Sequence, residues 1–176
     1  HLGIFTMLQP TEALVYPLDN FTLDIQQGYC APAAADLFVS PDGLPFNSGL
    51  SADEPIQSLF QAITMIQCSA ATPRTIHLAA GTYSSATTGE VYPLELKTGL
   101  TLSGSGMNNS ILDADSAAYC LMAYETTDAE VHNCAITGAS ACGFWVKGSQ
   151  LMCSQMRLYN NRSKYNYAAG MHLQND

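Results

Sequence analysis

Hydrophobic residues in the second half of the chain recur in short runs that alternate with polar residues. Alternation with a period of two places successive side chains on opposite faces of a β-strand. The clearest early runs, at 75–79, 94–97 and 100–103, are each followed closely by a glycine that can end a strand. The pattern therefore predicts a domain built from many short strands.

From residue 120 onward these runs resemble variants of one unit of about 20 residues. Val131 and Ile136, for example, are matched 20 residues later by Leu151 and Met156. A weak repeat of this length is typical of a solenoid. An antiparallel sandwich or barrel gives a similar pattern, but the strands are not joined by the two-residue Asn-Gly or Asp-Gly turns that antiparallel pairs favour. The repeat favours an all-β fold, a right-handed parallel β-helix.

One segment, 53–67, has the period of a helix instead. Acidic residues stand at its start, Pro55 falls in its first turn, and its apolar residues recur every three or four positions. We expect this α-helix to cap the N-terminal end of the β-helix, because a solenoid otherwise exposes an unpaired strand edge at each end.

The segment before residue 37 differs from the rest of the chain. Its runs at 13–16 and 21–25 have strand composition but no hairpin partner. We therefore divide the chain into an N-terminal extension, 1–36, and a β-helix domain, 37–176. The extension could be exchanged with a neighbouring subunit as an added strand.

Composition narrows the functional classes. The chain has 176 residues, of which 47% are hydrophobic and 12% charged, as expected for one packed domain. Its formal charge of -9 argues against nucleic acid as a partner. The charge is uneven, because residues 1–73 contain seven acids and no Lys or Arg, whereas residues 144–176 contain four bases and one acid.

Cysteine usage and sequons favour an oxidising, extracellular location. The six cysteines form no CxxC pair, which disfavours zinc and suits disulfides. Three Asn-x-Ser/Thr triplets predict glycosylation at Asn20, Asn108 and Asn161. No apolar run is long enough to span a membrane. We expect a secreted protein whose signal peptide has been removed.

Several segments together resemble a known family. They are Leu37-Phe-Val-Ser-Pro-Asp-Gly43, Glu54-Pro-Ile-Gln-Ser-Leu-Phe-Gln-Ala-Ile63, Arg74-Thr-Ile-His-Leu-Ala-Ala-Gly-Thr-Tyr83, Tyr92-Pro-Leu-Glu-Leu-Lys97 and Leu100-Thr-Leu-Ser-Gly-Ser-Gly106. Their combination resembles the entry region of parallel β-helix proteins of the pectin-lyase-like superfamily, and DUF1565 in particular. The resemblance covers the chain from residue 37 onward and implies the fold; function does not follow from it.

The superfamily includes polysaccharide lyases and glycosidases, whose catalytic motifs can be compared with this chain. The polygalacturonase motifs are absent. For a pectate-lyase-like enzyme, four acids could supply Ca²⁺ ligands and a Lys or Arg could act as the base. These candidates are Asp113, Asp115, Asp128 and Glu130, with Lys147 or Arg157 as the base. The same four acids could instead form a solvated acidic edge with no function. We therefore assign no catalytic residue, no metal ligand and no cofactor. Ca²⁺ would be a cofactor only if the lyase interpretation holds.

Other candidate residues also have a structural interpretation. Three histidines, His77, His132 and His172, stand in apolar strands without a nucleophile motif. Four aromatic residues could stack on sugar rings, although aromatics near a coil surface more often pack on one another. They are Trp145, Tyr159, Tyr165 and Tyr167. The glycines of Gly104-Ser-Gly106 do not open a helix, so we expect a turn and not a phosphate loop.

The expected β-helix also suggests disulfides, because residues one coil apart lie about 4.8 Å from each other. Cys120 and Cys142, and likewise Cys134 and Cys153, are separated by about one coil. We expect these two bridges, with a third between Cys30 and Cys68; buried free thiols are the alternative.

The two ends of the β-helix suggest a function. No helix is predicted to cap the C-terminal end, so either the polypeptide continues beyond Asp176 or another subunit covers that edge. Together with the opposite charges of the two ends, this favours a secreted structural protein that assembles with itself, head to tail, into a filament or surface layer. The alternatives are a carbohydrate-active enzyme and a non-catalytic polysaccharide-binding module.

Overall fold

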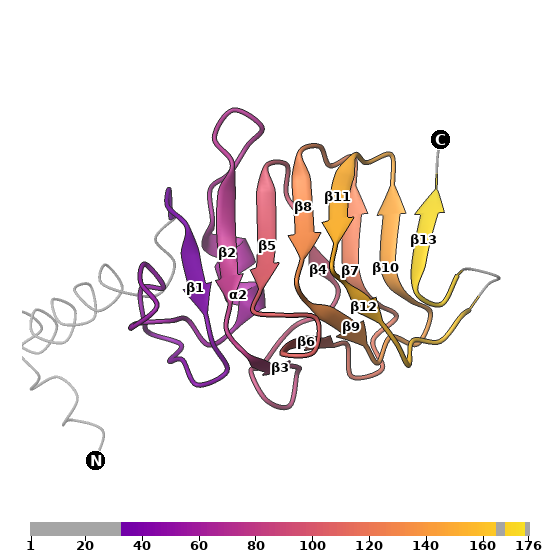
Figure 1. Ribbon diagram of the computed structural model, residues 1–176, viewed down its shortest axis with the longest axis horizontal. Coiled ribbons are helices and arrows are strands. Elements are labelled where there is room, and N and C mark those ends of the chain that lie inside the picture. Colours follow the sequence, from indigo (N-terminus) through magenta and orange to yellow (C-terminus); the bar gives the residue numbers. More distant parts are fainter. Residues whose placement is uncertain (1–32, 165–167, 175–176) are drawn as a thin grey trace, which may run out of the picture. The chain divides into compact units, whose positions relative to one another are not determined.

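The computed structural model describes residues 33–164 and 168–174, which belong to one compact unit, Pro32–Asp176. This unit is a right-handed parallel β-helix (Figure 1). Its elements are β1 Leu37–Val39, α2 Leu59–Met65, β2 Arg74–Leu78, β3 Gly81–Tyr83, β4 Leu94–Glu95, β5 Leu100–Gly104, β6 Ser110–Asp113, β7 Tyr119–Tyr124, β8 Ala129–His132, β9 Ala135–Thr137, β10 Cys142–Lys147, β11 Leu151–Ser154, β12 Arg157–Leu158 and β13 Met171–Gln174. The predicted fold class is confirmed.

The strands form three parallel sheets that enclose the core. Their orders are β1-β2-β5-β8-β11, β13-β10-β7-β4 and β12-β9-β6-β3, so each sheet takes one strand from each successive coil (Figure 1). The inward residues of consecutive coils stack on one another; Ile76, Leu102 and Val131, for example, are aligned and fully buried. Stacked aliphatic side chains of this kind supply the main stabilisation of the fold.

The coil that runs from β8 to β11 is 22 residues long and not 20. Val131 is aligned with Cys153, and Ile136 is aligned with Leu158. The corner before β9 contains Asn133, with φ of 57°, and the corner one coil later contains Gln155, with φ of 49°. These left-handed corners fix where each strand ends, and the shift of two residues keeps the same face inward.

The predicted helix is present but shorter than expected. Residues 53–58 are not helical, because Ile56 lies on the open edge of β1, where it is bridged to Val39. The helix begins after Ser58, whose side chain accepts a hydrogen bond from the backbone N–H of Gln61, 3.3 Å away. Leu59, with three other apolar residues of α2, is buried in the core.

Other predictions from the sequence have mixed outcomes. The runs expected at 75–79, 94–97 and 100–103 correspond to β2, β4 and β5, and the repeat expected from residue 120 onward contains most of β7 and all of β8 to β13; β3 and β6 lie outside the expected runs. The predicted extension, 1–36, falls almost entirely outside the described residues and remains a prediction. Within the described part of the chain, no helix is long and apolar enough to cross a membrane.

Candidate functional site

The outer face of the β4-β7-β10-β13 sheet carries an unusual set of side chains. Strand alternation places Leu121 and Ala123 of β7 in the core and turns Tyr124 outward, where it is 45% exposed. In β10 the same alternation buries Phe144 and leaves Trp145 half-buried on the outer face. Polar and aromatic residues therefore share one solvent-facing surface, which we call the aromatic face.

Register brings the side chains of the aromatic face into two rows. The first row runs Glu95, Met122, Trp145 and His172, and the second runs Tyr124, Lys147 and Gln174. Neighbours within a row lie on adjacent strands, which are about 4.8 Å apart. The rows cross the strands, so an extended ligand could contact several coils in succession.

Aromatic rings cluster around Trp145. The rings of Trp145 and Tyr124 are parallel within 2°, with centroids 6.5 Å apart. The Tyr119 ring is tilted by 42°, with its centroid 6.2 Å from that of Trp145. The ammonium of Lys147 stands 5.7 Å from the centre of the Tyr124 ring, within the range of a cation–π interaction. These contacts hold the rings in fixed orientations, as a rigid binding surface requires.

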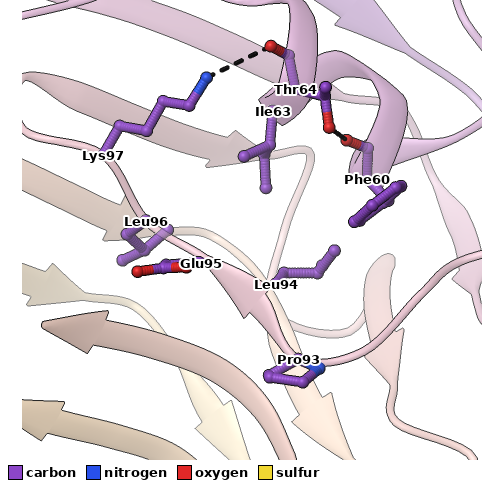
Figure 2. A pocket seen from close by; sticks show the side chains of 8 residues that line it. All are labelled: Phe60, Ile63, Thr64, Pro93, Leu94, Glu95, Leu96 and Lys97. Atoms are coloured by element: carbon purple, nitrogen blue, oxygen red, sulfur yellow. Dashed lines mark hydrogen bonds between the residues drawn. The ribbon is translucent and has the colours of Figure 1, made fainter.

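A pocket of about 380 Å³ lies between α2 and β4, at the edge of the same sheet (Figure 2). Phe60 and Ile63 come from the helix side, and residues 93–97 come from the strand side. The Lys97 side chain extends from the strand side to the end of α2. Its ammonium donates hydrogen bonds to the carbonyl oxygens of Thr64, 3.4 Å away, and Ile66, 3.1 Å away. This places a positive charge at the C-terminal end of α2, where the helix dipole favours it. Glu95 belongs both to the pocket and to the first row, so the pocket and the aromatic face are continuous.

A buried carboxylate holds the helical wall of this pocket in place. Glu90 is only 3% exposed, and its oxygens accept hydrogen bonds from the backbone N–H groups of Leu59, at 2.8 Å, and Phe60, at 2.7 Å. The hydroxyls of Thr88, at 2.9 Å, and Ser58, at 3.1 Å, donate to the same carboxylate. These bonds satisfy N–H groups in the first turn of α2 that have no partner within the helix. Glu90 therefore fixes the helix that forms one wall of the pocket.

The environment of Glu90 makes stability depend on pH. Burial raises the pKa of its carboxyl above the ordinary value, and the hydrogen bonds from Phe60, Leu59, Thr88 and Ser58 oppose that shift. Because the folded state then binds the proton more tightly than the unfolded state, the free energy of unfolding falls as pH rises from about 4.3 through the raised pKa.

We expect the Glu90→Gln variant to lack this contribution. In urea unfolding between pH 4 and pH 7, the difference in free energy of unfolding between wild type and variant should decrease as pH rises. A difference that increases with pH would show that the folded state lowers the pKa of Glu90 instead.

Sequence comparison relates the chain to a family. The family model described as a protein of unknown function, DUF1565, matches residues 43–141, more than half of the chain. The chain belongs to the DUF1565 family. This DUF1565 protein has no match among curated proteins and none among solved structures. The resemblance to DUF1565 is confirmed over residues 43–141, whereas it was expected from residue 37 to the end of the chain.

The calcium ligands considered for a lyase do not converge in this DUF1565 protein. Asp113 lies on β6, where its side chain accepts a hydrogen bond from the backbone N–H of Asp115, whereas Asp128 and Glu130 lie at β8 in another sheet. Lys147 lies on β10, in the β13-β10-β7-β4 sheet. Among the described residues, no group of three or more His, Cys, Asp or Glu side chains could hold a metal ion. The residues considered for a lyase therefore lie on three different sheets and do not come together in one site.

Arg157, the other base considered for a lyase, has structural contacts. Its guanidinium stands 4.5 Å from the centre of the Tyr159 ring and donates a hydrogen bond to the side-chain oxygen of Asn108, 3.1 Å away. His77 stacks on Phe38, with ring centroids 4.8 Å apart. Such contacts agree with the structural interpretation of these residues.

Two further expectations can be compared with the structure. Gly104 ends β5, and Gly106 leads into the turn at 107–109 that connects β5 to β6, so the turn lies directly after the glycines from which it was predicted. Tyr165 and Tyr167 fall outside the described residues. The sequence interpretation overlooked Tyr124 and Glu95, although their outward position follows from the alternation with buried neighbours in β7 and β4.

The disulfides expected for this DUF1565 protein are not formed in the structure. Five cysteines are free thiols, and Cys30 lies outside the described residues. The five are Cys68, Cys120, Cys134, Cys142 and Cys153. Burial raises the pKa of Cys134 to about 12, which leaves little of its reactive thiolate at neutral pH. The three pairings remain predictions.

The register explains why coil spacing alone is a weak guide to these bridges. Cys142 is aligned with Tyr119 and not with Cys120, and Cys153 is aligned with Val131. The thiol of Cys120 points toward the carbonyl oxygen of Leu112, 3.7 Å away. A bridge between Cys120 and Cys142 would therefore join neighbours that are out of register.

The three sequons also differ in their surroundings. Asn108 is exposed, and Asn20 lies outside the described residues. Asn161 is half-buried, and its side-chain amide bonds the preceding coil: it accepts from the N–H of Ala139, 3.1 Å away, and donates to the carbonyl oxygen of Ile136, 3.0 Å away. Glycosylation at all three positions remains a prediction, and Asn108 is the more accessible of the two described sites.

Proposed function

We propose that this DUF1565 protein binds a neutral polysaccharide along its aromatic face, as a non-catalytic module. The observation that carries the proposal is the parallel pair of Trp145 and Tyr124 on the outer surface of a rigid sheet. Sugar rings have an apolar face that packs on aromatic rings, and their hydroxyls need polar neighbours. Glu95 and Gln174 stand on the same face and can supply such hydrogen bonds.

The arrangement suits an extended chain ligand. The aromatic face continues into the pocket between α2 and β4, where the exposed Phe60 ring offers a further apolar surface. A polysaccharide that runs across the strands would lie along the first row, with His172 at one end and this pocket at the other. We expect neutral polymers to bind more tightly than polyuronates, because the formal charge of -9 repels polyanions.

Trp145 is the single tryptophan of the chain, so its fluorescence reports directly on the proposed site. Titration with neutral soluble glucans, mannans and xylans should change the emission of Trp145 for at least one polymer. In affinity electrophoresis with the same polymer, Trp145→Ala should weaken binding about 30-fold, the effect of losing a hot-spot side chain worth about 2 kcal/mol.

Tyr159→Ala is the matched control, because Tyr159 is an aromatic residue packed on Arg157 outside the aromatic face. Its retardation in the gel should equal that of wild type. Equal binding by wild type and Trp145→Ala, or unchanged emission with every neutral polymer, would refute the proposal. Polygalacturonate, with and without Ca²⁺, serves as the charged comparison, and release of unsaturated product from it would establish a lyase instead.

The proposed ligand is consistent with the predicted location. Neutral structural polysaccharides of cell walls lie outside cells, and the sequons and even number of cysteines motivate the same compartment. Secretion stays a prediction of the sequence.

A further inference from the structure

The helix α2 closes one end of the aromatic face. Among the described residues β4 is the edge strand of its sheet, and α2 occupies the place beyond it (Figure 1). Leu59 and three other residues of α2 pack in the core, whereas Phe60 is 40% exposed. A helix with its side chains is about 10 to 12 Å across, thicker than a single strand. Because the inner side of α2 packs in the same core as β4, its outer side forms a wall across the first row.

Two charged side chains fix this wall to the coil that carries β4. Glu90, shortly before β4, accepts hydrogen bonds from backbone N–H groups at the start of α2. Lys97, shortly after β4, donates hydrogen bonds to the carbonyl oxygens of Thr64 and Ile66 at the other end of the helix. Both ends of α2 are therefore tied to the segment that forms the opposite wall of the pocket. The helix cannot move aside for a ligand without breaking these bonds.

The pocket in front of this wall combines apolar surface with two polar side chains. Phe60, Ile63 and Pro93 contribute apolar lining, and Glu95 and Lys97 contribute a carboxylate and an ammonium. An ammonium has three donors, of which Lys97 uses two for carbonyl oxygens of the helix segment, so one remains for a ligand hydroxyl. The volume of about 380 Å³ is at the lower end of the range of small-ligand pockets, roughly 300 to 1,000 Å³. It suits a single sugar unit better than a length of polymer.

We infer that this pocket receives the terminal sugar of the polysaccharide, so that the protein recognises chain ends. The inference rests on the proposed polysaccharide binding and specifies which part of the polymer is bound. A polymer that follows the first row toward Glu95 meets α2, and an interior segment cannot continue through that wall. A terminal sugar has no further unit to accommodate, and it carries one hydroxyl that an interior sugar uses in a glycosidic bond. Glu95 and Lys97 line the pocket, where they can bond this additional hydroxyl.

The number of protein molecules bound per polymer chain tests the inference. The neutral polysaccharide that changes the emission of Trp145 is cut into unbranched fractions of known length, and each fraction is titrated by isothermal calorimetry. A linear chain has one end of each kind, so we expect one protein per chain in short and long fractions alike. A ratio that grows with chain length would show binding along chain interiors and would overturn the inference.

A variant of the pocket gives a second test. Phe60→Ala should weaken binding of the shortest fraction about 10-fold, because it removes apolar surface from the pocket. Phe46→Ala is the matched control, since Phe46 is also exposed, at 69%, but does not line the pocket; this variant should bind like wild type. Circular dichroism of both variants should match wild type because both rings are exposed. Equal binding by the two variants would contradict the role assigned to the pocket.

Reduction with borohydride distinguishes the two ends, because it opens the ring of the reducing-end sugar only. Loss of binding after reduction assigns the pocket to the reducing end, and unchanged binding at one protein per chain assigns it to the other end; both results support the inference. Failure of the proposed function gives a different result. A protein that binds no neutral polysaccharide refutes both proposals, whereas several proteins per long chain, with Trp145→Ala still weakened, refute only the recognition of chain ends.

Discussion

Replacement of Phe144 by alanine is expected to lower the free energy of unfolding by about 3 to 5 kcal/mol. Phe144 is fully buried in β10, where it is aligned with the buried Leu121 on one side and with Met171 on the other. Its ring therefore bridges three successive coils. Removal leaves a cavity that neighbouring coils cannot fill, because backbone ladders on both sides hold β10 in position.

Urea unfolding followed by circular dichroism measures this loss. The adjacent residue provides the matched control, because Trp145 points outward: Trp145→Ala should cost less than about 1 kcal/mol of stability while it weakens polysaccharide binding as predicted above. If Phe144→Ala does not fold, Phe144→Leu should fold with a loss of about 1 to 2 kcal/mol. Losses of equal size at positions 144 and 145 would contradict the strand alternation on which the site rests.

Replacement of Glu90 by alanine is expected to lower the free energy of unfolding by about 3 kcal/mol. The substitution leaves four donors without their acceptor, including the buried backbone N–H of Leu59, and each buried unsatisfied group costs about 1 to 3 kcal/mol. Water that enters the space left by the side chain can recover part of this loss. The same variant should loosen α2 and with it one wall of the pocket.

Glu95→Ala is the control for Glu90→Ala, because Glu95 is an exposed acid nearby in the chain and its loss should change stability by less than about 0.5 kcal/mol. Hydrogen exchange of the α2 amides should quicken in Glu90→Ala and stay unchanged in Glu95→Ala. Unaltered α2 protection in Glu90→Ala would show that Ser58 alone is enough to hold the start of the helix.

The candidate site is only partly inside the segment that matches DUF1565. The pocket residues lie within residues 43–141, whereas Trp145, Lys147 and His172 follow that segment. The segment shared with the family therefore contains much of the β-helix framework and all residues that line the pocket. Of the aromatic residues, Tyr119 and Tyr124 lie within the matched segment and Trp145 lies beyond it.

Much of the framework could be predicted from local sequence. The short alternating runs predicted β2, β4 and β5, and the glycines at 104 and 106 predicted a turn after β5. The start of the helix was misjudged because the acids at 53 and 54 resemble a first turn, while the chain there pairs with β1 instead. Local signals cannot report a bridge to a distant strand.

The amino-acid sequence by itself determined that this protein is a parallel β-helix of short strands, because the alternation of apolar and polar residues and the presence of a repeat can be recognised along the chain. Only the tertiary structure decided the register between coils. A slip of two residues keeps every side chain on its face, so Val131 could be matched with Leu151 although it lies against Cys153. Two features of the site depend on this register and on contacts between distant segments. They are the stacking of Tyr124 on Trp145 and the capping of α2 by Glu90. The hydrophobic pattern of the sequence does not predict either of them.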